Sequence, residues 1–214
     1  MIAVVDYGVG NLRSVQKALE QVGAGATVTS RAADLDAARG IVLPGVGAFG
    51  DGMASLHARG LAAPVVEQVQ RGKPLLGICL GMQMLFEESD EMGRHAGLGL
   101  LPGRVVRFVD EALKVPHVGW NRLRIQKQAG PHPLLAGIAP GAYAYFVHSY
   151  YPVPAEAGDV LATTEYGVEF ASVVGRGQVW GAQFHPEKSQ EVGLRILANF
   201  ARLCGALEAE EVAS

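Results

Sequence analysis

A cysteine flanked by glycines occupies residues 77–81, Gly-Ile-Cys-Leu-Gly, between an apolar run at 74–76 and a segment at 82–86 that reads as a helix. A strand that turns sharply into a helix at a nucleophilic side chain is a nucleophile elbow. Such a turn presses neighbouring Cβ atoms against the backbone, and Gly77 and Gly81 have none. The turn also places the Cys79 sulfur near a helix N-terminus, whose free N–H groups favour a thiolate. The segment therefore predicts a strand, a turn and a helix that carry a reactive cysteine.

A histidine and a carboxylate two residues apart, His185 and Glu187, offer a general base and the group that orients it. A lone buried cysteine is more often a small core residue, and His148 competes with His185 for the role of base. Glu187 favours His185, because it occupies the next position on the same face of an extended segment. Taken together, the residues predict a cysteine-nucleophile enzyme with Cys79, His185 and Glu187 as its catalytic group.

The glycine-rich loop at 45–50 matches Gly-x-Gly-x-x-Gly after an expected strand, a pattern typical of dinucleotide binding. The match is weak, because the loop follows the third expected strand, Pro44 opens it, and Glu67 is an imperfect ribose-binding acid. Acyl transfer offers a better use, since its oxyanion needs one N–H from the residue after the nucleophile and another from a separate loop. We expect the backbones of Leu80 and Val46 to supply them. A non-catalytic nucleotide-binding module remains an alternative.

The bulk composition excludes several classes of protein. The chain has 214 residues, is 49% hydrophobic and 18% charged, and carries a net charge of −3. This composition excludes disorder and shows no electrostatic footprint for nucleic acid. No apolar run approaches the roughly 20 residues that a membrane span needs, and the first six residues do not resemble a signal peptide. We therefore expect no nucleic-acid or membrane partner.

The numbers and spacings of cysteine and histidine indicate where in the cell the protein is found and whether it binds a metal. Two cysteines give no disulfide framework, and Cys204 falls on the apolar stripe of an expected C-terminal helix. Both thiols are then reduced, which indicates a cytoplasmic protein. None of the six histidines is paired with another at a metal-ligand spacing such as His-x-x-x-His. We expect neither a metal nor a cofactor.

Hydrophobic patterning predicts an α/β fold. In the first half, strands are expected at 2–6, 26–29, 40–43 and 74–78, with helices from Asn11 to about residue 22 and over 61–70. This alternation favours a parallel sheet with right-handed crossovers. The second half is mostly strand-like, at 104–109, 120–125, 144–147, 160–164, 168–174 and 178–184, before a closing helix at 189–205. The expected architecture is a flavodoxin-like open, mostly parallel sheet flanked by helices, with an added antiparallel section, in a single domain over 1–207 followed by a polar tail at 208–214.

An acidic run at 87–91 follows the expected helix after Cys79. Such a run is by default a solvated surface turn. Its closeness to Cys79 in the sequence allows one carboxylate to meet a cationic group of a substrate.

The two signatures at 77–83 and 185–187, in this order, resemble the class I, triad-type glutamine amidotransferases. Five segments resemble more specifically the glutaminase subunits of imidazole glycerol phosphate synthases, from histidine biosynthesis; they are 7–11, 44–49, 116–121, 146–151 and 185–189. The similarity covers nearly the whole chain. Related glutaminases of anthranilate, purine or pyridoxal phosphate synthesis share the triad but usually differ in these five segments.

The resemblance implies a reaction and a substrate site. Cys79 would attack the side-chain amide of glutamine, His185 would act as base and then as acid toward the leaving ammonia, and Glu187 would hold the imidazole. Water would then hydrolyse the thioester to glutamate. The same resemblance implies that five residues hold the glutamine: Gly47, Gln83, Glu91, Ser149 and Tyr150.

The resemblance also implies a partner. Ammonia released into neutral water would be protonated, and the chain has no evident phosphate site for a synthase substrate. The implied partner is a separate (β/α)8-barrel cyclase that forms a heterodimer with this chain and receives the ammonia. Three residues adjoining loops near the triad are interface candidates: Asn11, Trp120 and Lys188. Two further alternatives are a glutaminase subunit of another synthase and a non-amidotransferase cysteine hydrolase on a related fold.

Overall fold

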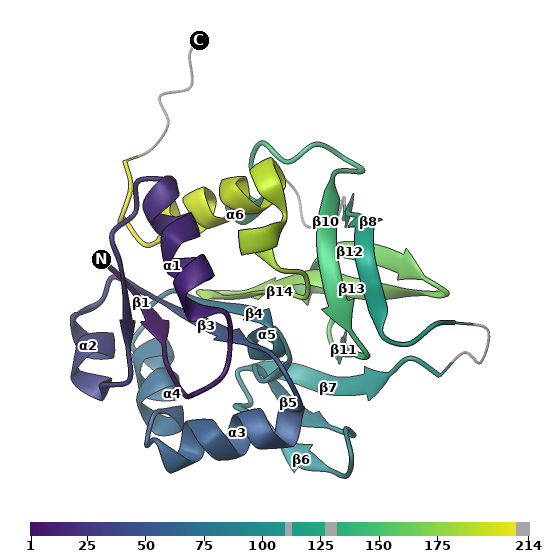
Figure 1. The fold of residues 1–214 in the computed structure, drawn as a ribbon, viewed down its shortest axis with the longest axis horizontal. Helices are drawn as coiled ribbons and strands as arrows, with labels where there is room; N and C mark the ends of the chain where they lie inside the picture. Colours follow the sequence, from purple (N-terminus) through teal and green to yellow (C-terminus); the bar gives the residue numbers. More distant parts are fainter. Residues whose placement is uncertain (110–112, 127–131, 209–214) are drawn as a thin grey trace.

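Parallel and antiparallel strands share one central sheet in the computed structural model, which describes residues 1–109, 113–126 and 132–208 (Figure 1). The parallel part contains, in spatial order, β2 (Ala26–Thr29), β1 (Ile2–Val5), β3 (Gly40–Gly45), β4 (Leu75–Cys79) and β14 (Val179–Ala182). The antiparallel part continues with β13 (Val168–Arg176), β12 (Val160–Tyr166) and β9 (Arg124–Ile125). The strand order of the parallel part is that of flavodoxin-like folds.

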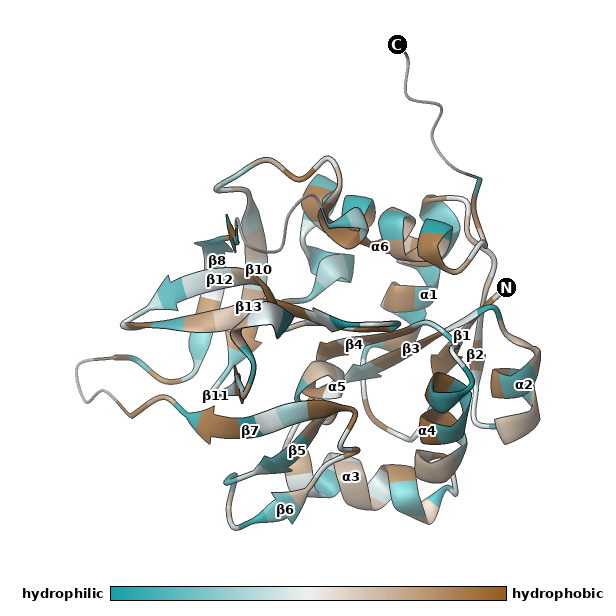
Figure 2. Ribbon diagram, turned by 180° about the vertical axis from the view of Figure 1, so that it is seen from behind, coloured by the Kyte–Doolittle hydropathy of each residue, from teal (hydrophilic) through white to brown (hydrophobic). Residues whose placement is uncertain are grey.

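Helices cover both faces of the parallel part (Figure 1). One face packs against α1 (Leu12–Gln21) and α6 (Gln190–Leu203). The other packs against α2 (Ala32–Ala37), α3 (Phe49–Ala58), α4 (Ala62–Gln70) and the single-turn α5 (Leu80–Gln83). Successive residues of β1 enter opposite cores, Ile2 and Val4 on the first side and Ala3 and Val5 on the second. Because both of their faces are buried, β1, β3 and β4 are apolar throughout, as the brown strands of Figure 2 show, whereas the edge strand β2 contains two threonines.

Two smaller sheets flank the carboxyl end of the central one. One pairs β8 (His117–Arg122) with β10 (Tyr143–His148). The other contains β11 (Tyr150–Pro154), β7 (Leu101–Arg107), β5 (Phe86–Ser89) and β6 (His95–Ala96), in that order. Three short 3₁₀ turns complete the described elements: η2 (Pro133–Leu135), η3 (Ala157–Asp159) and η4 (Pro186–Lys188). The chain passes directly from β10 to β11 through Ser149, so one turn joins the two small sheets.

The structure confirms the predicted fold class and most of the predicted elements. Asn11 stands at the N-cap of α1, although its side chain makes no capping hydrogen bond. The helix expected at 82–86 is wrong in extent, because α5 ends at Gln83 and Phe86 begins β5. A tertiary contact ends the helix, because the Met84 carbonyl accepts a hydrogen bond from the N–H of the distant Leu98 and not from a residue of α5. Sequence patterns also missed α2, α3 and β11.

Two further points concern the chain ends and membranes. The polar tail predicted over 208–214 lies outside the described residues apart from Glu208. In the ranges that the structure describes, no helix is both long enough and apolar enough to cross a bilayer.

The elbow depends on the missing side chain of Gly81, which leads to a stability prediction. A Cβ at Gly81 would collide with the backbone carbonyl of Leu43 in β3, whereas one at the exposed Gly25 would meet nothing within 4 Å. We expect Gly81→Ala to lower the free energy of unfolding by about 3 kcal/mol or more, and Gly25→Ala by less than about 1 kcal/mol. Denaturant unfolding of the two variants measures the difference. Equal stability of the two would contradict this account of the elbow.

Candidate active site

Three neighbouring parallel strands end at one edge of the sheet and bring the predicted groups together. In the strand register, Gly45 of β3 pairs with Cys79 at the end of β4, and Ala182 of β14 pairs with Ile78. His185 follows Ala182 by three residues and therefore reaches the level of Cys79. Ligands of open α/β sheets bind outside the carboxyl ends of the strands, and this edge is such a place.

The backbone at Cys79 adopts an uncommon conformation, with φ of 53° and ψ of −111°. Positive φ is unfavourable for a residue with a Cβ, and residues in strained backbone conformations cluster at functional sites. The flanking glycines make the turn possible. A Cβ at Gly77 would stand 2.6 Å from the Gly81 carbonyl oxygen, and one at Gly45 would stand 2.9 Å from the Leu80 Cβ. The predicted elbow is present, with Cys79 at its apex and only 6% exposed.

His185 and Glu187 form a buried pair beside the elbow. The distance between His185 Nδ1 and Glu187 Oε1 is 2.9 Å, and the two side chains are 5% and 1% exposed. Pro186 begins η4 between them, so the segment turns at this point and is not extended over residues 185–187 as we expected. The tight 3₁₀ turn still brings both side chains to the same side.

The charge state of His185 is set by its neighbours. Burial lowers the pKa of His185, but hydrogen bonds to Cys79 and Glu187, together with their negative charges, more than offset it and raise the pKa to about 10. His185 therefore holds a proton at neutral pH. A protonated imidazole beside a cysteine stabilises the thiolate, which is the nucleophilic form.

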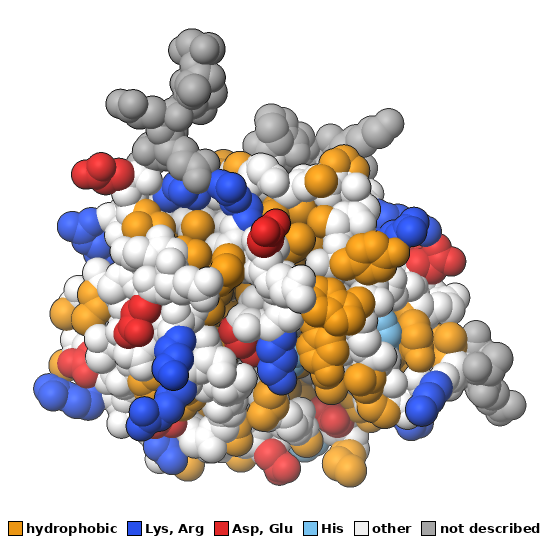
Figure 3. Space-filling view, turned by 45° about the horizontal axis from the view of Figure 1, so that its top comes forward, with side chains coloured by type: hydrophobic (Ala, Val, Ile, Leu, Met, Phe, Trp, Pro, Cys, Tyr) orange, Lys and Arg blue, Asp and Glu red, His pale blue; other side chains and the backbone are white. Residues whose placement is uncertain are grey.

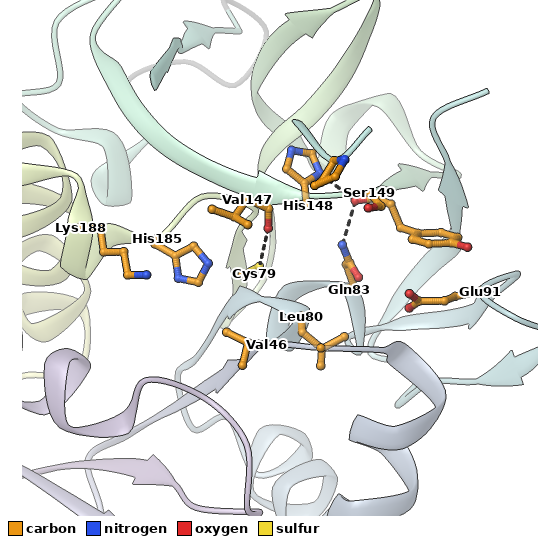
Figure 4. A pocket seen from close by; sticks show the side chains of 13 residues that line it. Val46, Cys79, Leu80, Gln83, Glu91, Val147, His148, Ser149, His185 and Lys188 are labelled. Atoms are coloured by element: carbon orange, nitrogen blue, oxygen red, sulfur yellow. Dashed lines mark hydrogen bonds between the residues drawn. The ribbon is translucent and has the colours of Figure 1, made fainter. Parts of the chain in front are cut away.

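Other groups surround the Cys79 sulfur. The Cys79 thiol lies 3.7 Å from the Val147 carbonyl oxygen (Figure 4). The Gln183 side-chain amide donates to the sulfur at 3.9 Å. Gln83 holds Gln183 in place by donating to its Oε1 at 3.0 Å, and it also donates to the Tyr150 carbonyl at 2.9 Å. Sequence reasoning missed the position of Gln183, although the residue lies two positions before His185 in a predicted strand.

A cavity of about 330 Å³ opens in front of the sulfur (Figure 4). Ten of the residues predicted from the sequence line it: Val46, Gly47, Cys79, Leu80, Gln83, Glu91, Ser149, Tyr150, His185 and Lys188. Glu187 does not line it, because this residue lies behind His185. The lining also includes Pro116, Val147 and His148, of which only His148 carries a side chain that sequence reasoning had considered for catalysis.

Glu91 connects the cavity to the glycine-rich loop. Its Oε2 accepts a hydrogen bond from the Phe49 N–H at 2.7 Å, at the start of α3. The N-cap residue of α3, Ala48, has no side chain that could serve this purpose, so Glu91 caps the helix from a distance. The acidic run is thus partly a strand, β5, and its last residue points toward the site and not toward solvent alone.

His148, the rival base in the sequence analysis, is buried and engaged on both sides. Its Nδ1 lies 2.8 Å from the Tyr150 carbonyl oxygen and its Nε2 lies 3.0 Å from Nδ1 of His117. Burial lowers the pKa of His148 to about 3, and the charges of His117 and His185 act in the same direction, against the Tyr150 hydrogen bond. Burial also lowers the pKa of His117 to about 4. These features favour His185 over His148 as the base.

Of the three interface candidates, Lys188 lines the cavity, whereas Trp120 and Asn11 do not. Lys188 is exposed, and its Nζ lies 5.9 Å from the centroid of the Tyr145 ring. Trp120 is 47% exposed on β8 and makes an edge contact with the same ring, at 5.9 Å between centroids. Asn11 lies farther along, at the start of α1, which packs against η4.

The described residues contain no cluster of three or more His, Cys, Asp or Glu side chains placed to hold a metal ion.

Comparison with models of known protein families identifies the family of this chain. The glutamine amidotransferase class-I family model matches residues 3–204. This chain belongs to that family. Several of its relatives are named imidazole glycerol phosphate synthase subunit HisH. The amidotransferase is 54% identical over 206 residues to that of Syntrophotalea carbinolica (94% of this chain, 98% of the relative), and 56% identical over 203 residues to that of Desulfitobacterium hafniense (94% of each). This chain is also 48% identical to the HisH subunit of Salinibacter ruber over the full length of both chains.

Solved structures support the same fold. The structure titled PurLQS from Thermotoga maritima superposes with a TM-score of 0.74 at 22% identity, covering 94% of this chain and 97% of that one. A crystal structure titled glutamine amidotransferase gives a TM-score of 0.71 at 23% identity, covering 96% and 100%. These similarities confirm the α/β architecture of the amidotransferase.

The depressed pKa values of His117 and His148 predict acid sensitivity. The unfolded chain binds protons on these residues near pH 6.5, whereas the folded chain binds them only near pH 4 and pH 3. Their contribution to stability is therefore complete above pH 6.5 and is lost as the pH falls below it, by up to about 1.4 kcal/mol per pH unit for each histidine. Unfolding by urea between pH 7 and pH 4 measures this slope. We expect a shallower slope for His117→Phe, and parallel curves would contradict the prediction.

Proposed function

We propose that this chain is the glutaminase subunit of an imidazole glycerol phosphate synthase. It hydrolyses glutamine to glutamate and ammonia and passes the ammonia to a cyclase partner in histidine biosynthesis. The observation that carries the proposal is the arrangement of Cys79 on its strained elbow beside the buried His185–Glu187 pair, at the mouth of a cavity. The HisH relatives, at 54% and 56% identity, support the particular pathway.

In the proposed mechanism, the Cys79 sulfur attacks the carbonyl carbon of the glutamine side-chain amide. The resulting oxyanion collapses to a thioester as the C–N bond breaks, and His185 gives its proton to the departing nitrogen, which leaves as ammonia. Water then attacks the thioester, with His185 accepting the proton and the sulfur leaving as thiolate. Glu187 keeps the imidazole oriented and stabilises its cationic form throughout.

The oxyanion would be held by backbone N–H groups from two loops. Leu80 follows the nucleophile, and Val46 and Gly47 lie in the loop after β3; all three line the cavity (Figure 4). Gly47 has a φ of 97°, so this loop needs a glycine to take its path. One such donor is typically worth about 2.7–4 kcal/mol in the transition state.

The amino-acid part of the substrate would lie on the other side of the cavity. Glu91 suits the α-ammonium group, because its Oε2 is engaged by the Phe49 N–H while the residue still borders the cavity. Ser149 and Tyr150, in the turn between β10 and β11, would contact the polar ends of glutamine through backbone groups. Gln83 would act less directly, since its amide already holds the Tyr150 carbonyl and Gln183.

The partner would bind beside the cavity. An apolar strip runs across β8 and β10, where Val118, Trp120, Tyr143 and Val147 are 57%, 47%, 46% and 36% exposed. On the right of Figure 3, apolar side chains gather over the side where Figure 1 shows β8 and β10. Contiguous exposed apolar surface of this kind marks interaction sites. Because the Val147 carbonyl also borders the Cys79 sulfur, a cyclase bound here would lie next to the point of ammonia release.

Two subsidiary features belong to the same proposal. We place the chain in the cytoplasm, since the chemistry needs a reduced Cys79 and the structure has both Cys79 and Cys204 as free thiols. We also treat residues 1–207 as one domain, because residues from both halves of the chain build the two cores.

Replacement of the nucleophile tests the proposed reaction. Cys79→Ala is expected to reduce ammonia release from glutamine by about 10⁴-fold or more, in the presence of the histidine-pathway cyclase, because no other group forms the thioester. The matched control is Cys204→Ala, which removes a buried thiol beside Gly40 and is expected to retain activity. Substantial turnover by Cys79→Ala, or equal losses in both variants, would reject the mechanism. Binding of NAD without ammonia release by the wild-type chain would favour the nucleotide-binding alternative.

Truncation of the exposed tryptophan tests the proposed partner surface. We expect Trp120→Ala to weaken binding of the cyclase by at least about tenfold, because large aromatic side chains dominate interface energetics. Val153→Ala is the control, since Val153 is 42% exposed but lies on β11 outside the strip. Titration calorimetry with the purified cyclase measures both affinities. If Trp120→Ala binds as tightly as Val153→Ala, the strip is not the interface.

A further inference from the structure

Two buried histidines lie side by side at the wall of the cavity, which His148 lines and His117 does not. His117 of β8 and His148 of β10 are directly opposite in the strand register, and they are 3% and 6% exposed. The distance from His117 Nδ1 to His148 Nε2 is 3.0 Å. They are 31 positions apart in the sequence, so only the pairing of the two strands brings them together.

Hydrogen-bond partners determine which nitrogen of each ring carries the proton. The Tyr150 carbonyl can only accept, so His148 must donate to it from a protonated Nδ1 at 2.8 Å. The neutral His148 ring then has a bare Nε2, which accepts from the Nδ1–H of His117. The bare Nε2 of His117 in turn accepts from the Asn121 side-chain amide at 3.2 Å. Both rings are thereby held as neutral Nδ1–H tautomers in one directed chain of hydrogen bonds.

Aromatic side chains enclose the two rings. His117 is stacked between Phe146 and Tyr166, with centroid distances of 5.0 Å and 4.1 Å. His148 lies against Phe108 at 5.3 Å and Phe170 at 5.1 Å. In such surroundings phenylalanine would pack as well as histidine and would avoid the cost of burying polar atoms. The polar atoms of the pair therefore indicate a need for its hydrogen bonds beyond packing.

The chain of hydrogen bonds ends on the turn that forms the cavity wall. The Tyr150 carbonyl accepts from His148 Nδ1–H and from the Gln83 amide, and the neighbouring Ser149 carbonyl accepts from the Phe108 N–H at 3.2 Å. Ser149 and Tyr150 both line the cavity. His148 therefore holds the Tyr150 carbonyl of this turn and is itself held by His117, while Phe108 holds the Ser149 carbonyl.

We propose that His117 and His148 are positioning residues for glutamine, acting as a neutral, tautomer-fixed pair that holds the turn at residues 148–150 in its substrate-binding shape. The inference rests on the proposed glutaminase function. His148 does not exchange protons with the substrate in this role, and His117 does not border the cavity at all. Their effect is on substrate affinity through the peptide groups of Ser149 and Tyr150.

Kinetics of paired variants test the proposal in the complex with the cyclase. His117→Phe keeps the ring stacking but removes the donor to His148, and we expect it to raise the KM for glutamine about tenfold while kcat changes less than about threefold. His117→Asn, whose amide can stand where Nδ1–H was, is expected to recover most of the KM. His132→Phe is the matched control: it removes another partly buried histidine, which caps η2 away from the cavity, and is expected to leave KM unchanged.

The outcomes separate a positioning role from a structural one. A lower melting temperature for His117→Phe with an unchanged KM would overturn the proposal, as would a fall in kcat alone, which would indicate proton transfer. Failure of the wild-type complex to release ammonia would instead reject the proposed function. Nitrogen-15 NMR of the wild-type chain at neutral pH supplies a readout that needs no activity and no variant. Neutral Nδ1–H signals are expected for both histidines, and Nε2–H tautomers or a protonated ring would overturn the inference.

Discussion

The close approach of α5 to the end of β3 is the constraint on which the active edge depends. Gly81 lies so near the Leu43 carbonyl that no Cβ fits between them, and a Cβ at Gly77 would stand within 2.7 Å of the Gly81 and Met82 backbone. Because Gly77 and Gly81 are both confined, the chain must reverse direction at Cys79, which adopts a positive φ. The cost of this conformation is offset by the burial of β4 in the middle of the sheet, between β3 and β14. A stable core thus maintains the uncommon backbone conformation of Cys79.

Three histidines near this edge have different charge states although all are buried. His185 lies between Cys79 and Glu187, whose hydrogen bonds and negative charges together raise the pKa of His185 more than burial lowers it, so the ring stays protonated. His148 and His117 face aromatic rings, a carbonyl and each other, so burial keeps them neutral. The cation on His185 further disfavours a second cation on His148. The three histidines differ in charge because the groups around each ring differ, and only His185, next to the Cys79 sulfur, is an imidazolium.

Local patterns predicted the elements whose own residues determine them. The inner parallel strands β1, β3 and β4 are apolar along their whole length, and α1 and α6 have a regular apolar stripe, so each was recognisable without knowledge of its neighbours. The predictions failed where contacts with residues distant in the sequence determine the local structure. The segment after Cys79 looks helical, but hydrogen bonds from Leu98 and Gly99 to Met84 and Phe86 draw it into a sheet. The short α2 and the strand β11 offer too few residues for a periodic signal.

The same division holds for the site. The amino-acid sequence by itself determined the elbow at Cys79, the His185–Glu187 pair and the loop at Val46, because each is a short motif whose chemistry follows from adjacent residues. Only the tertiary structure decided that Gln183 donates to the sulfur, that Glu91 caps α3, and that His117 meets His148. These contacts join residues 31 to 104 positions apart. They depend on strand order and register, which arise from the packing of the whole sheet and leave no mark on the sequence near either residue.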